Sequence, residues 1–363
     1  LSVAPWANRP TGQVLVSMLE ADGSPCAYDA RFLLRSLAER LQGHGMTAVM
    51  ASEMEFHLFE LEDDELGRPR HTQSDRVGGS LASGQTYCLE TMEEQAEVMH
   101  AINDACQVQD LPVDTLIKEA GPSQYEINLY HTADALLAAD QAVLLQRTVR
   151  AVARQHGMRA TFMAKPYGDL AGNGMHIHCS LVDADGRNLF DDGTPAGTPL
   201  LRQAIAGCLA GLPDSMLMFA PNVNSFRRFQ DGSHAPLAPA WGYENRTVAV
   251  RVPTDVPEAT RLEHRVAGAD AHPHLVMASV LAGIIHGVES RLAGPEPIEG
   301  NAYEQVEASL PRYLPDALSR FESSDFIGEY LGVRFREVFS KIKYQELAEY
   351  DRQVTPLEYD AAL

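Results

Sequence analysis

Residues 47–60 read TAVMASEMEFHLFE, and this stretch decides the fold because its apolar and charged side chains alternate. A period of two predicts a β-strand, since successive strand side chains point to opposite faces. One face then carries Met50, Ser52, Met54, Phe56 and Leu58. The other face carries Glu53, Glu55 and His57.

Two glutamates on one strand face raise an electrostatic problem. Glu53 and Glu55 repel each other, and each loses hydration if the face is buried. A bound cation would stabilise such a pair, whereas the plainer alternative is a solvated outer face. One Glu-x-Glu pair by itself favours the plainer alternative. Three further motifs with complementary residues shift the balance toward a cation site.

The composition limits the classes of partner. The chain has 363 residues, for which length alone suggests about two domains, and its 45% of hydrophobic residues are enough for a sizeable core. Its 50 Asp and Glu against 29 Lys and Arg give a formal net charge of −21. This charge argues against nucleic acid and anionic membranes as partners, and it suits divalent metals or positively charged substrates.

The cysteine spacing and the apolar runs indicate the cellular compartment of the protein. Five cysteines with no Cys-x-x-Cys spacing predict a reduced, cytoplasmic protein without a disulfide framework or a thiolate zinc site. The longest apolar run, around residues 275–285, contains small residues and predicts a buried helix rather than a membrane span. No signal peptide is recognisable. The chain begins at Leu1, so we expect an N-terminal part to be missing.

Caps and breakers elsewhere predict a mixture of helices and strands. Asp29 is expected to cap a helix that runs to about Gln42. The other expected elements are a strand at 14–19, a loop at 62–80, a helix at 93–110, a hairpin at 115–130, a helix at 134–156, strands within 160–182, a helix at 271–290 and a mainly helical tail from 314. Because the elements do not alternate as βαβ units, the α+β class is favoured.

Two further motifs add carboxylates and histidines. Glu119 and Glu126 stand on either side of a Gly-Pro turn, where a hairpin would bring them together, although alone they resemble ordinary surface acids. After the glycine-rich turn at 172–174, one strand face carries His176, His178 and Ser180. A lone histidine is usually structural, but two on one face behind such a turn favour a ligand site.

Arginines accompany a fourth motif. Glu263 and Arg265 share a strand face, for which the plainer alternative is a surface ion pair of little energetic value. Arginines within apolar, β-like sequence need anionic partners if they are buried, and a guanidinium group matches carboxylates and phosphates. The arginines in such sequence are Arg228, Arg246 and Arg251. The odd spacing of Arg246 and Arg251 requires a bend or bulge if both face one site.

Together these motifs predict a divalent-metal site for phosphoryl transfer. Five glutamates and one metal-type histidine suit Mg²⁺ or Mn²⁺. Divalent metals combined with arginines are typical of phosphoryl transfer. The sequence has no G-x-x-x-x-G-K-[ST] motif and no kinase glycine-rich signature, so a nucleotide would be held by another architecture.

In this order the motifs resemble the glutamine synthetase superfamily over nearly the whole chain. The matching segments are Glu53-x-Glu55-Phe, Glu119-x-Gly-Pro-x-Gln-x-Glu126, Phe162-Met-x-Lys-Pro166, Gly172-Asn-Gly-Met-His-x-His178, Pro221-Asn-x-Asn-Ser-x-x-Arg228, Asn245-Arg246 through Arg251, and Arg261-x-Glu263-x-Arg265. The resemblance implies one catalytic domain over residues 1–363, in which a curved antiparallel sheet forms a funnel surrounded by helices. Family members are stacked-ring oligomers, usually dodecamers, and carry a small N-terminal β-grasp domain that we expect to be missing here.

The resemblance also implies roles for the matched residues. It assigns one metal to Glu55, Glu119 and Glu126, and the second to Glu53, His176 and Glu263, with two or three Mg²⁺ or Mn²⁺ ions per site. It assigns ATP to His178, Ser180, Arg251 and Arg261. It assigns glutamate to Gly172, Arg228, Arg246 and Arg265, and stabilisation of the transferred phosphate to Arg246, Arg251 and Arg265. The implied reaction phosphorylates the γ-carboxylate of glutamate with ATP, and an amine then attacks the γ-glutamyl phosphate.

Departures from the family pattern concern the amine. Ammonia-using members carry a glutamate just before Ala-Pro in a flap, where this chain has His234, which would accept a proton rather than attract a small cation. The segments Trp241-Gly-Tyr-Glu244-Asn-Arg246, Gly300-Asn-Ala-Tyr303 and Val354-Thr-Pro-Leu-Glu-Tyr359 resemble the γ-glutamylpolyamine synthetase branch. Glu244 and Trp241 would hold an ammonium group through charge and cation–π contact. The equally weighted alternative places Trp241 in the core and pairs Glu244 with an arginine.

The leading hypothesis is an ATP-dependent ligase that joins glutamate to a polyamine such as putrescine or spermidine, or to a monoamine. The second hypothesis is a glutamine synthetase that uses ammonia. The third is a non-catalytic relative in a structural or regulatory ring, which the six intact metal-ligand positions disfavour. Expected partners are the small-molecule substrates and further copies of the same chain.

Overall fold

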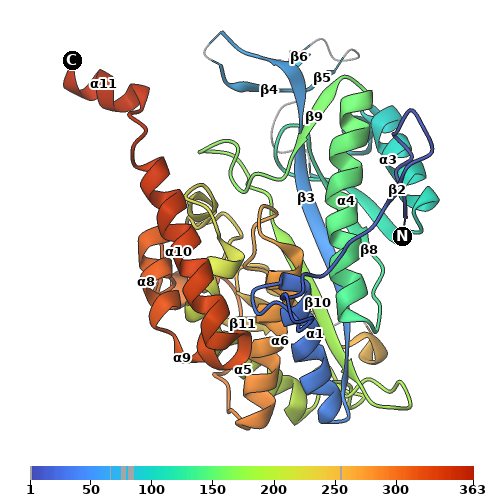
Figure 1. Ribbon diagram of the computed structural model, residues 1–363, viewed down its shortest axis with the longest axis vertical. Helices are drawn as coiled ribbons and strands as arrows, with labels where there is room; N and C mark the ends of the chain where they lie inside the picture. Colours follow the sequence, from blue (N-terminus) through green and yellow to red (C-terminus); the bar gives the residue numbers. More distant parts are fainter. Residues whose placement is uncertain (1, 66, 75–78, 81–85, 254–255) are drawn as a thin grey trace.

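A computed structural model describes residues 2–65, 67–74, 79–80, 86–253 and 256–363. The strand β3, Thr47–Asp63, runs through the middle of the molecule (Figure 1). One of its faces is apolar and fully buried at Met54, Phe56 and Leu58, as the alternation predicts. Glu53 and Glu55 are on the opposite face and are partly buried.

Within the described part of the chain, the sheet around β3 has nine strands in the order β11-β12-β13-β10-β3-β8-β7, and β4 and β9 also pair with β3. Every pair is antiparallel except β11 with β12, which are parallel. The other strands are β4 Pro69–His71, β7 Val113–Lys118, β8 Gln124–Leu129, β9 Met158–Thr161, β10 Met175–Val182, β11 Trp241–Tyr243, β12 Val250–Val252 and β13 Leu262–His264. The predicted hairpin is therefore β7–β8, and the α+β class is confirmed.

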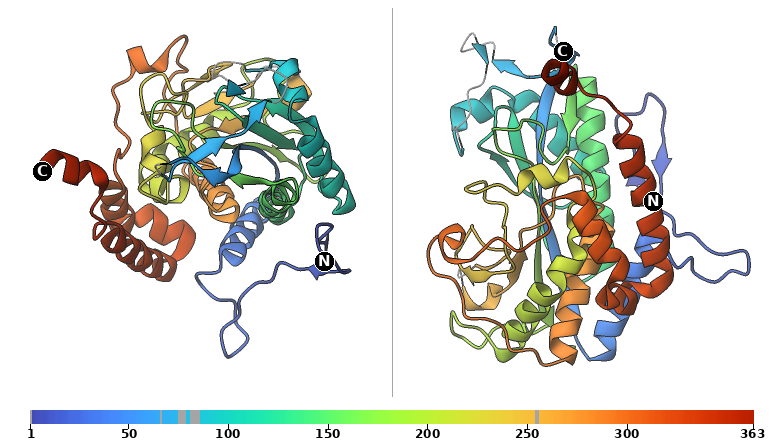
Figure 2. Two further views of the ribbon diagram at one scale, coloured as in Figure 1. Left: turned by 90° about the horizontal axis from the view of Figure 1, so that it is seen from above. Right: turned by 90° about the vertical axis from the view of Figure 1, so that its left-hand side faces the viewer.

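Long helices cover one face of this sheet (Figure 2). They are α1 Ala30–Gly43, α4 Ala135–Gln155 and α6 Pro273–Glu289, with α5 Pro199–Phe219 packed on α6. The side chains of Asp29 and Asp134 accept hydrogen bonds from the first turns of α1 and α4, which fixes where these helices begin. The close approach of α5 and α6 requires glycine, because a methyl group on Gly207 would lie 2.0 Å from the carbonyl oxygen of Gly283.

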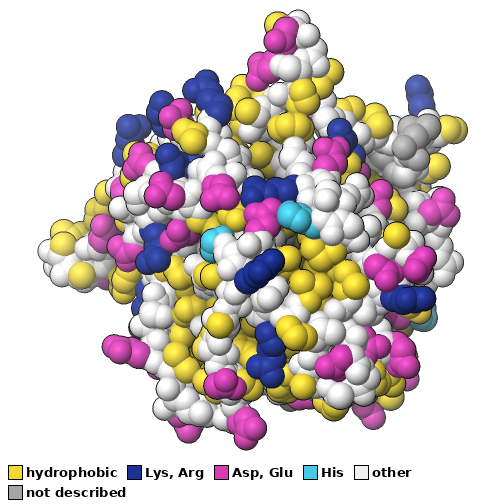
Figure 3. Space-filling view, turned by 90° about the horizontal axis from the view of Figure 1, so that it is seen from below, with side chains coloured by type: hydrophobic (Ala, Val, Ile, Leu, Met, Phe, Trp, Pro, Cys, Tyr) yellow, Lys and Arg dark blue, Asp and Glu magenta, His cyan; other side chains and the backbone are white. Residues whose placement is uncertain are grey.

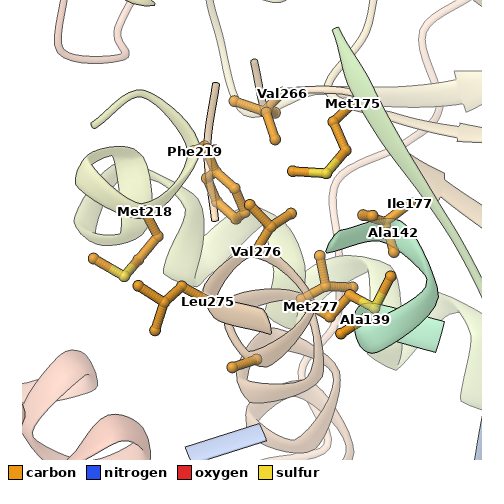
Figure 4. Packing of buried hydrophobic residues seen from close by; sticks show 14 of the residues in the cluster. Ala139, Ala142, Met175, Ile177, Met218, Phe219, Val266, Leu275, Val276 and Met277 are labelled. Atoms are coloured by element: carbon orange, nitrogen blue, oxygen red, sulfur yellow. The ribbon is translucent and has the colours of Figure 1, made fainter. Parts of the chain in front are cut away.

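The core lies between the sheet and these helices. In Figure 4, Met175 and Ile177 of β10 face side chains of α4, α5 and α6, among them Ala142, Phe219 and Val276. All five are essentially fully buried. Each large apolar side chain buried in this way contributes about 1.5–3 kcal/mol to folding. This packing holds β10 and β3 rigidly in place, and their other faces carry the candidate site.

The remaining elements are shorter or lie outside this arrangement. They are β1 Ser2–Val3, β2 Gly12–Gln13, β5 Gln73–Ser74, β6 Gly79–Ser80, α2 Leu89–Glu93, α3 Ala96–Val108, α7 Ala302–Gln305, α8 Leu314–Ser323, α9 Asp325–Ile327, α10 Val333–Tyr350 and α11 Pro356–Ala362, with short helical turns at Ser225–Arg228, Pro257–Ala259 and Gly328–Gly332. The helix α8 packs on α5 and α10, and α11 extends away from the body (Figure 1). The predicted helical tail is confirmed.

Three expectations about local structure need correction. Residues 14–19 are not a strand: the segment has no neighbouring strand to pair with apart from a single bridge at Leu19, and Val16 is 71% exposed. The expected loop at 62–80 includes the end of β3 and the short strands β4, β5 and β6. The expected helix at 93–110 is interrupted at Glu94–Gln95, which separates α2 from α3. The helices expected at 134–156 and 271–290 are α4 and α6.

The surface seen from below carries acidic side chains scattered among basic and apolar ones (Figure 3). The net charge of −21 is therefore not concentrated at one place on this face. Among the residues that the structure describes, none of the helices combines the length and the apolar content that a membrane span requires.

Candidate active site

Strand register brings the predicted acidic and histidine residues together. Glu53 of β3 is the partner of His176 across β3–β10, and His178 is the partner of Glu263 across β10–β13. Side chains directly opposite one another on neighbouring strands share a face and approach within about 5 Å. Four residues from three strands, β3, β10 and β13, therefore meet on one face of the sheet.

Glu53 lies between the two histidines. Its Oε2 is 2.9 Å from Nδ1 of His176, and its Oε1 is 2.7 Å from Nε2 of His178. Nε of Arg261 donates to Nδ1 of His178 at 3.1 Å, which leaves Nε2 of His178 facing Glu53. Burial raises the pKa of Glu53, but hydrogen bonds from His176 and His178 outweigh it and hold this pKa well below its usual range. Glu53 is therefore anionic at neutral pH.

Glu263 is fully buried between two arginines. Nη1 of Arg251 donates to its Oε2 at 2.9 Å, and Nη1 of Arg265 donates to its Oε1. Burial raises the pKa of Glu263, but the positive charge of Arg265 and the nearby His178 and His176 lower it further than burial raises it. Each carboxylate oxygen has a second lone pair, so these ion pairs leave Glu263 able to bind a cation as well.

For the glutamates on the other side of Glu53, burial and repulsion outweigh the groups that lower their pKa. Glu126 is the register partner of Glu55 across β3–β8, and Glu119 comes from the neighbouring end of the β7–β8 hairpin. Burial and then the charges of Glu53, Glu55 and Glu119 raise the pKa of Glu126 well above its usual value. Burial and then Glu55 raise the pKa of Glu119 to about 7. Buried carboxylates that repel one another in this way are stabilised by a cation.

Two groups of donor atoms lie close enough together to hold such a cation. The first is Glu53, His178 and Glu263, and the second is Glu53, Glu126 and His176. Carboxylate oxygens with one imidazole nitrogen fit Mg²⁺ or Mn²⁺, which would screen phosphate charge when bound. The grouping differs from the sets that the resemblance implied, because His178 joins a donor group. Among the described residues, Glu55 and Glu119 join neither group in this arrangement.

Glu55 is held by hydrogen bonds instead. Its Oε2 accepts from the backbone N–H of Gly174 at 2.7 Å and from Nε2 of Gln124 at 3.2 Å. Both bonds are to the same oxygen, so Oε1 is left for another ligand. The carboxylate of Glu55 is thus oriented from two elements, β8 and the turn before β10.

The glycine turn and Arg228 form the next part of the site. A methyl group on Gly172 would lie 2.4 Å from the carbonyl oxygen of Ala164 and 2.9 Å from Cγ of Arg228, so only glycine fits. Arg228 is buried and donates from Nη1 to the carbonyl oxygen of Val266 at 3.0 Å. Burial lowers the pKa of Arg228, which remains a cation that can bind a carboxylate. Gly172 and Arg228, both predicted glutamate contacts, are therefore adjacent.

The predicted ATP contacts continue along the same face. Ser180 is two residues after His178 on β10, is partly exposed and pairs with β3 at Val49. Arg261, in the loop before β13, donates to His178. Arg251, on β12, donates to Glu263. A row of cationic and polar side chains thus extends from the carboxylates toward one end of β10.

Comparison with known proteins decides the family. The sequence model of the glutamine synthetase catalytic domain matches residues 27–362. The chain belongs to the glutamine synthetase family.

Two curated relatives are named for amine ligation. The chain is 41% identical over 361 residues to the γ-glutamylputrescine synthetase of Escherichia coli (strain K12), covering 99% of this chain and 76% of the relative. It is 35% identical over 357 residues to the γ-glutamylethanolamide synthetase of Streptomyces coelicolor, covering 98% and 75%. The solved structure of a GmaS/ADP complex matches with a TM-score of 0.84 at 28% identity, covering 94% of this chain and 78% of that one.

Arg246 and His234 are both exposed in this family member. Arg246 lies in the turn before β12 rather than in a strand, which provides the bend that its odd spacing from Arg251 requires. Its Nη1 donates to the hydroxyl of Tyr87 at 3.1 Å. His234 is exposed and has a φ of 59°, an unusual backbone conformation for a residue with a side chain. Partial shielding of the ring and then the charge of Arg265 lower the pKa of His234, so its ring is neutral at pH 7.

Trp241 lies in the core and Glu244 pairs with an arginine, which is the alternative to an amine-binding role for these two residues. Trp241 is 1% exposed, and its indole N–H donates to the carbonyl oxygen of Pro295 at 2.8 Å. The guanidinium group of Arg202 already lies over its ring, 4.7 Å from the ring centre. Glu244 is 2.6 Å from Nη2 of Arg251. The predicted amine contact through Trp241 is therefore not supported, since the ring is enclosed and its face is occupied by Arg202.

Three residues of the site were not singled out from the sequence. Tyr87 stands alone in the sequence, and only its contact with Arg246 reveals it. Gln124 and Asn173 lie inside two of the motifs, but their positions between carboxylate and histidine residues gave no separate signal. Both make buried hydrogen bonds beside Glu55.

Proposed function

We propose that this protein is an ATP-dependent ligase that joins the γ-carboxylate of glutamate to an organic amine, with putrescine or a similar polyamine as the leading acceptor. The observation that carries the proposal is the cluster of Glu53, Glu126, His176, His178 and Glu263, flanked by Arg251 and Arg265. The names of the γ-glutamylputrescine and γ-glutamylethanolamide synthetases that it resembles support an organic amine.

The reaction has two steps. An oxygen of the γ-carboxylate attacks the terminal phosphorus of ATP, ADP leaves, and γ-glutamyl phosphate forms. The amine nitrogen then attacks the carbonyl carbon of the γ-glutamyl phosphate, the C–O bond to phosphate breaks, and the nitrogen loses a proton. In this scheme Arg228 binds the glutamate, and Arg251, Arg246 and Arg265 stabilise the charge that develops on the transferred phosphate.

In this proposal the flap residue His234 favours an organic amine as the acceptor. His234 occupies the position where ammonia-using relatives carry a glutamate, and its lowered pKa leaves the ring able to accept a proton at neutral pH. An alkylammonium has a pKa of about 10.4, so a base is needed before attack. Use of ammonia alone, which would make the protein a glutamine synthetase, remains the alternative function.

The same proposal extends to cofactors, assembly and location. We assign two or three Mg²⁺ or Mn²⁺ ions to each site, and one catalytic domain to residues 1–363. Continuous sheet pairing from β7 to β11 supports the single domain. A stacked-ring dodecamer and a cytoplasmic location complete the proposal. The five cysteines, all of which are free, agree with a reducing compartment.

An isotope experiment tests the chemistry. Glutamate labelled with ¹⁸O in its γ-carboxylate is incubated with ATP, Mg²⁺ and putrescine, and the products are analysed by mass spectrometry. Transfer of one ¹⁸O to phosphate, together with γ-glutamylputrescine, is expected. Phosphate without the label would refute the γ-glutamyl phosphate route, because the carboxylate oxygen would not have attacked phosphorus.

A further inference from the structure

A buried chain of hydrogen bonds links three elements behind the candidate site. Nδ1 of His57 on β3 is 2.8 Å from Oδ1 of Asn173 in the glycine turn. The same Oδ1 accepts from Nε2 of Gln124 on β8 at 3.3 Å. All three side chains are buried, and the three residues lie 49 to 116 positions apart in the sequence.

The direction of each hydrogen bond in this chain is fixed. Nδ2 of Asn173 donates to the carbonyl oxygen of Met163 at 2.8 Å, so Oδ1 must be the end that faces His57. An oxygen accepts, and therefore His57 carries its hydrogen on Nδ1. Burial lowers the pKa of His57 to about 4, which keeps the ring neutral and leaves Nε2 without a hydrogen. Nε2 is buried and has no hydrogen-bond partner among the described residues, so a histidine here costs free energy that a purely apolar ring would not.

The other end of the chain contacts the site itself. Oε1 of Gln124 accepts from the backbone N–H of Gly121 at 2.7 Å, which fixes the amide so that its NH₂ group points inward. That NH₂ group is 3.2 Å from Oε2 of Glu55 and 2.9 Å from the carbonyl oxygen of Gly172. One amide thus touches a proposed metal ligand and the proposed glutamate-binding turn.

The turn is clamped from both sides. The carbonyl oxygen of Gly172 accepts from Gln124, and the next N–H, that of Asn173, donates to the carbonyl oxygen of Ala164 at 2.8 Å. The N–H of Gly174 donates to Oε2 of Glu55. Rotation of the peptide group after Gly172 would therefore break hydrogen bonds to Gln124 and Ala164 together.

We propose that His57, Asn173 and Gln124 are positioning residues that set the orientation of Glu55 and of the Gly172 turn as one unit. Metal affinity and glutamate affinity are then coupled through side chains that touch neither ligand. This inference rests on the proposed function and on the family resemblance, which assigns Glu55 to a metal and Gly172 to glutamate. Removal of residues that orient metal ligands typically weakens metal binding about 10- to 100-fold.

The test uses four variants of the full-length protein. His57→Phe keeps the ring volume and removes the donor, and Asn173→Leu removes the acceptor. His57→Asn restores an N–H near the position of Nδ1. Thr148→Val is the matched control, because Thr148 is fully buried on α4, accepts from Gln109 and donates to Leu144, and is not part of the chain of hydrogen bonds.

Two measurements separate positioning from general destabilisation. Mn²⁺ alone is titrated in the absence of substrates, with binding followed by electron paramagnetic resonance, and the KM values for glutamate and ATP are measured separately. His57→Phe and Asn173→Leu should each raise the Mn²⁺ dissociation constant at least about 10-fold and raise the glutamate KM more than the ATP KM. His57→Asn should recover most of the loss, and Thr148→Val should change neither quantity.

Specific outcomes overturn the inference. The inference is overturned if His57→Phe or Asn173→Leu folds and its Mn²⁺ dissociation constant is unchanged. It is also overturned if Thr148→Val weakens Mn²⁺ binding by the same factor. Failure of His57→Asn to recover binding would show that ring packing, not the donor, is what matters. If the wild-type protein binds Mn²⁺ but forms no γ-glutamyl amide, the proposed function fails, while the Mn²⁺ titrations still decide the role of His57.

Discussion

Replacing Glu119 with glutamine tests whether the site is built to hold a cation. Burial and then repulsion from Glu55 raise the pKa of Glu119 from 4.5 to about 7. Because the folded-state pKa lies above the unfolded one, ionisation destabilises the fold. Stability is lost as the pH rises from about 4.5 to about 7, and the full loss persists at higher pH. At 1.36 kcal/mol per pH unit, the shift corresponds to roughly 3 kcal/mol.

The Glu119→Gln variant keeps the size of the side chain and removes the charge. Without metal at about pH 8, its free energy of unfolding should exceed that of the wild type by about 1–3 kcal/mol, and at about pH 4.5 the difference should vanish. Mn²⁺ should reduce this difference in free energy of unfolding. A cation that binds only the folded state adds about 2.7 kcal/mol to the stability when its concentration is 100 times its dissociation constant. The variant loses a charge that attracts Mn²⁺ and should gain less.

Urea unfolding with EDTA or Mn²⁺ measures these differences at both pH values. The matched control is Glu307→Gln, which removes the same charge from an exposed position. The reasoning is refuted if Glu119→Gln is no more stable than the wild type at about pH 8 without metal. It is equally refuted if the gain is the same at both pH values or is shared by Glu307→Gln.

Three further predictions concern the turn, the flap and the tryptophan. Gly172→Ala should lower stability by about 1–3 kcal/mol and raise the glutamate KM, whereas Gly168→Ala, which meets nothing within 4 Å, should change neither in unfolding and rate assays. Equal effects would contradict the close-approach argument. His234→Ala should lower amine-dependent kcat at least about 100-fold, and unchanged turnover would exclude it as the base. Trp241→Phe should lower the melting temperature with the amine KM unchanged; a raised KM would restore the amine-binding assignment.

The sequence predicts the strands and helices that carry a clear period or cap. The alternation around Glu53 defines β3, and Asp29 and Asp134 begin α1 and α4 where their side chains can accept from the first turn. It fails at residues 14–19, because alternation does not reveal whether a partner strand is available. The break at Glu94–Gln95 has no glycine or proline to signal it, so the local sequence does not predict it.

The candidate site, like the fold, could be predicted from the sequence only in part. The residue types that gather around Glu53 could be predicted from motifs, because the side-chain period places the glutamates and histidines of each motif on one face of its strand. The sequence could not predict which of these side chains form hydrogen bonds with one another, because this depends on which carboxylate oxygen each arginine or histidine reaches. One such contact is that of His178, a predicted ATP contact, whose Nε2 lies 2.7 Å from Oε1 of Glu53. Trp241 could not be assigned, because only burial shows that Arg202 already covers its ring.

The most direct test of the central claim is the ratio of kcat/KM for putrescine to that for ammonium. Phosphate release is measured with ATP, glutamate and Mg²⁺, with ethylamine, ethanolamine and spermidine in parallel. The account predicts turnover with organic amines and a ratio well above one, because the flap carries His234 in place of a carboxylate. Turnover with ammonium alone would contradict it and make the protein a divergent glutamine synthetase.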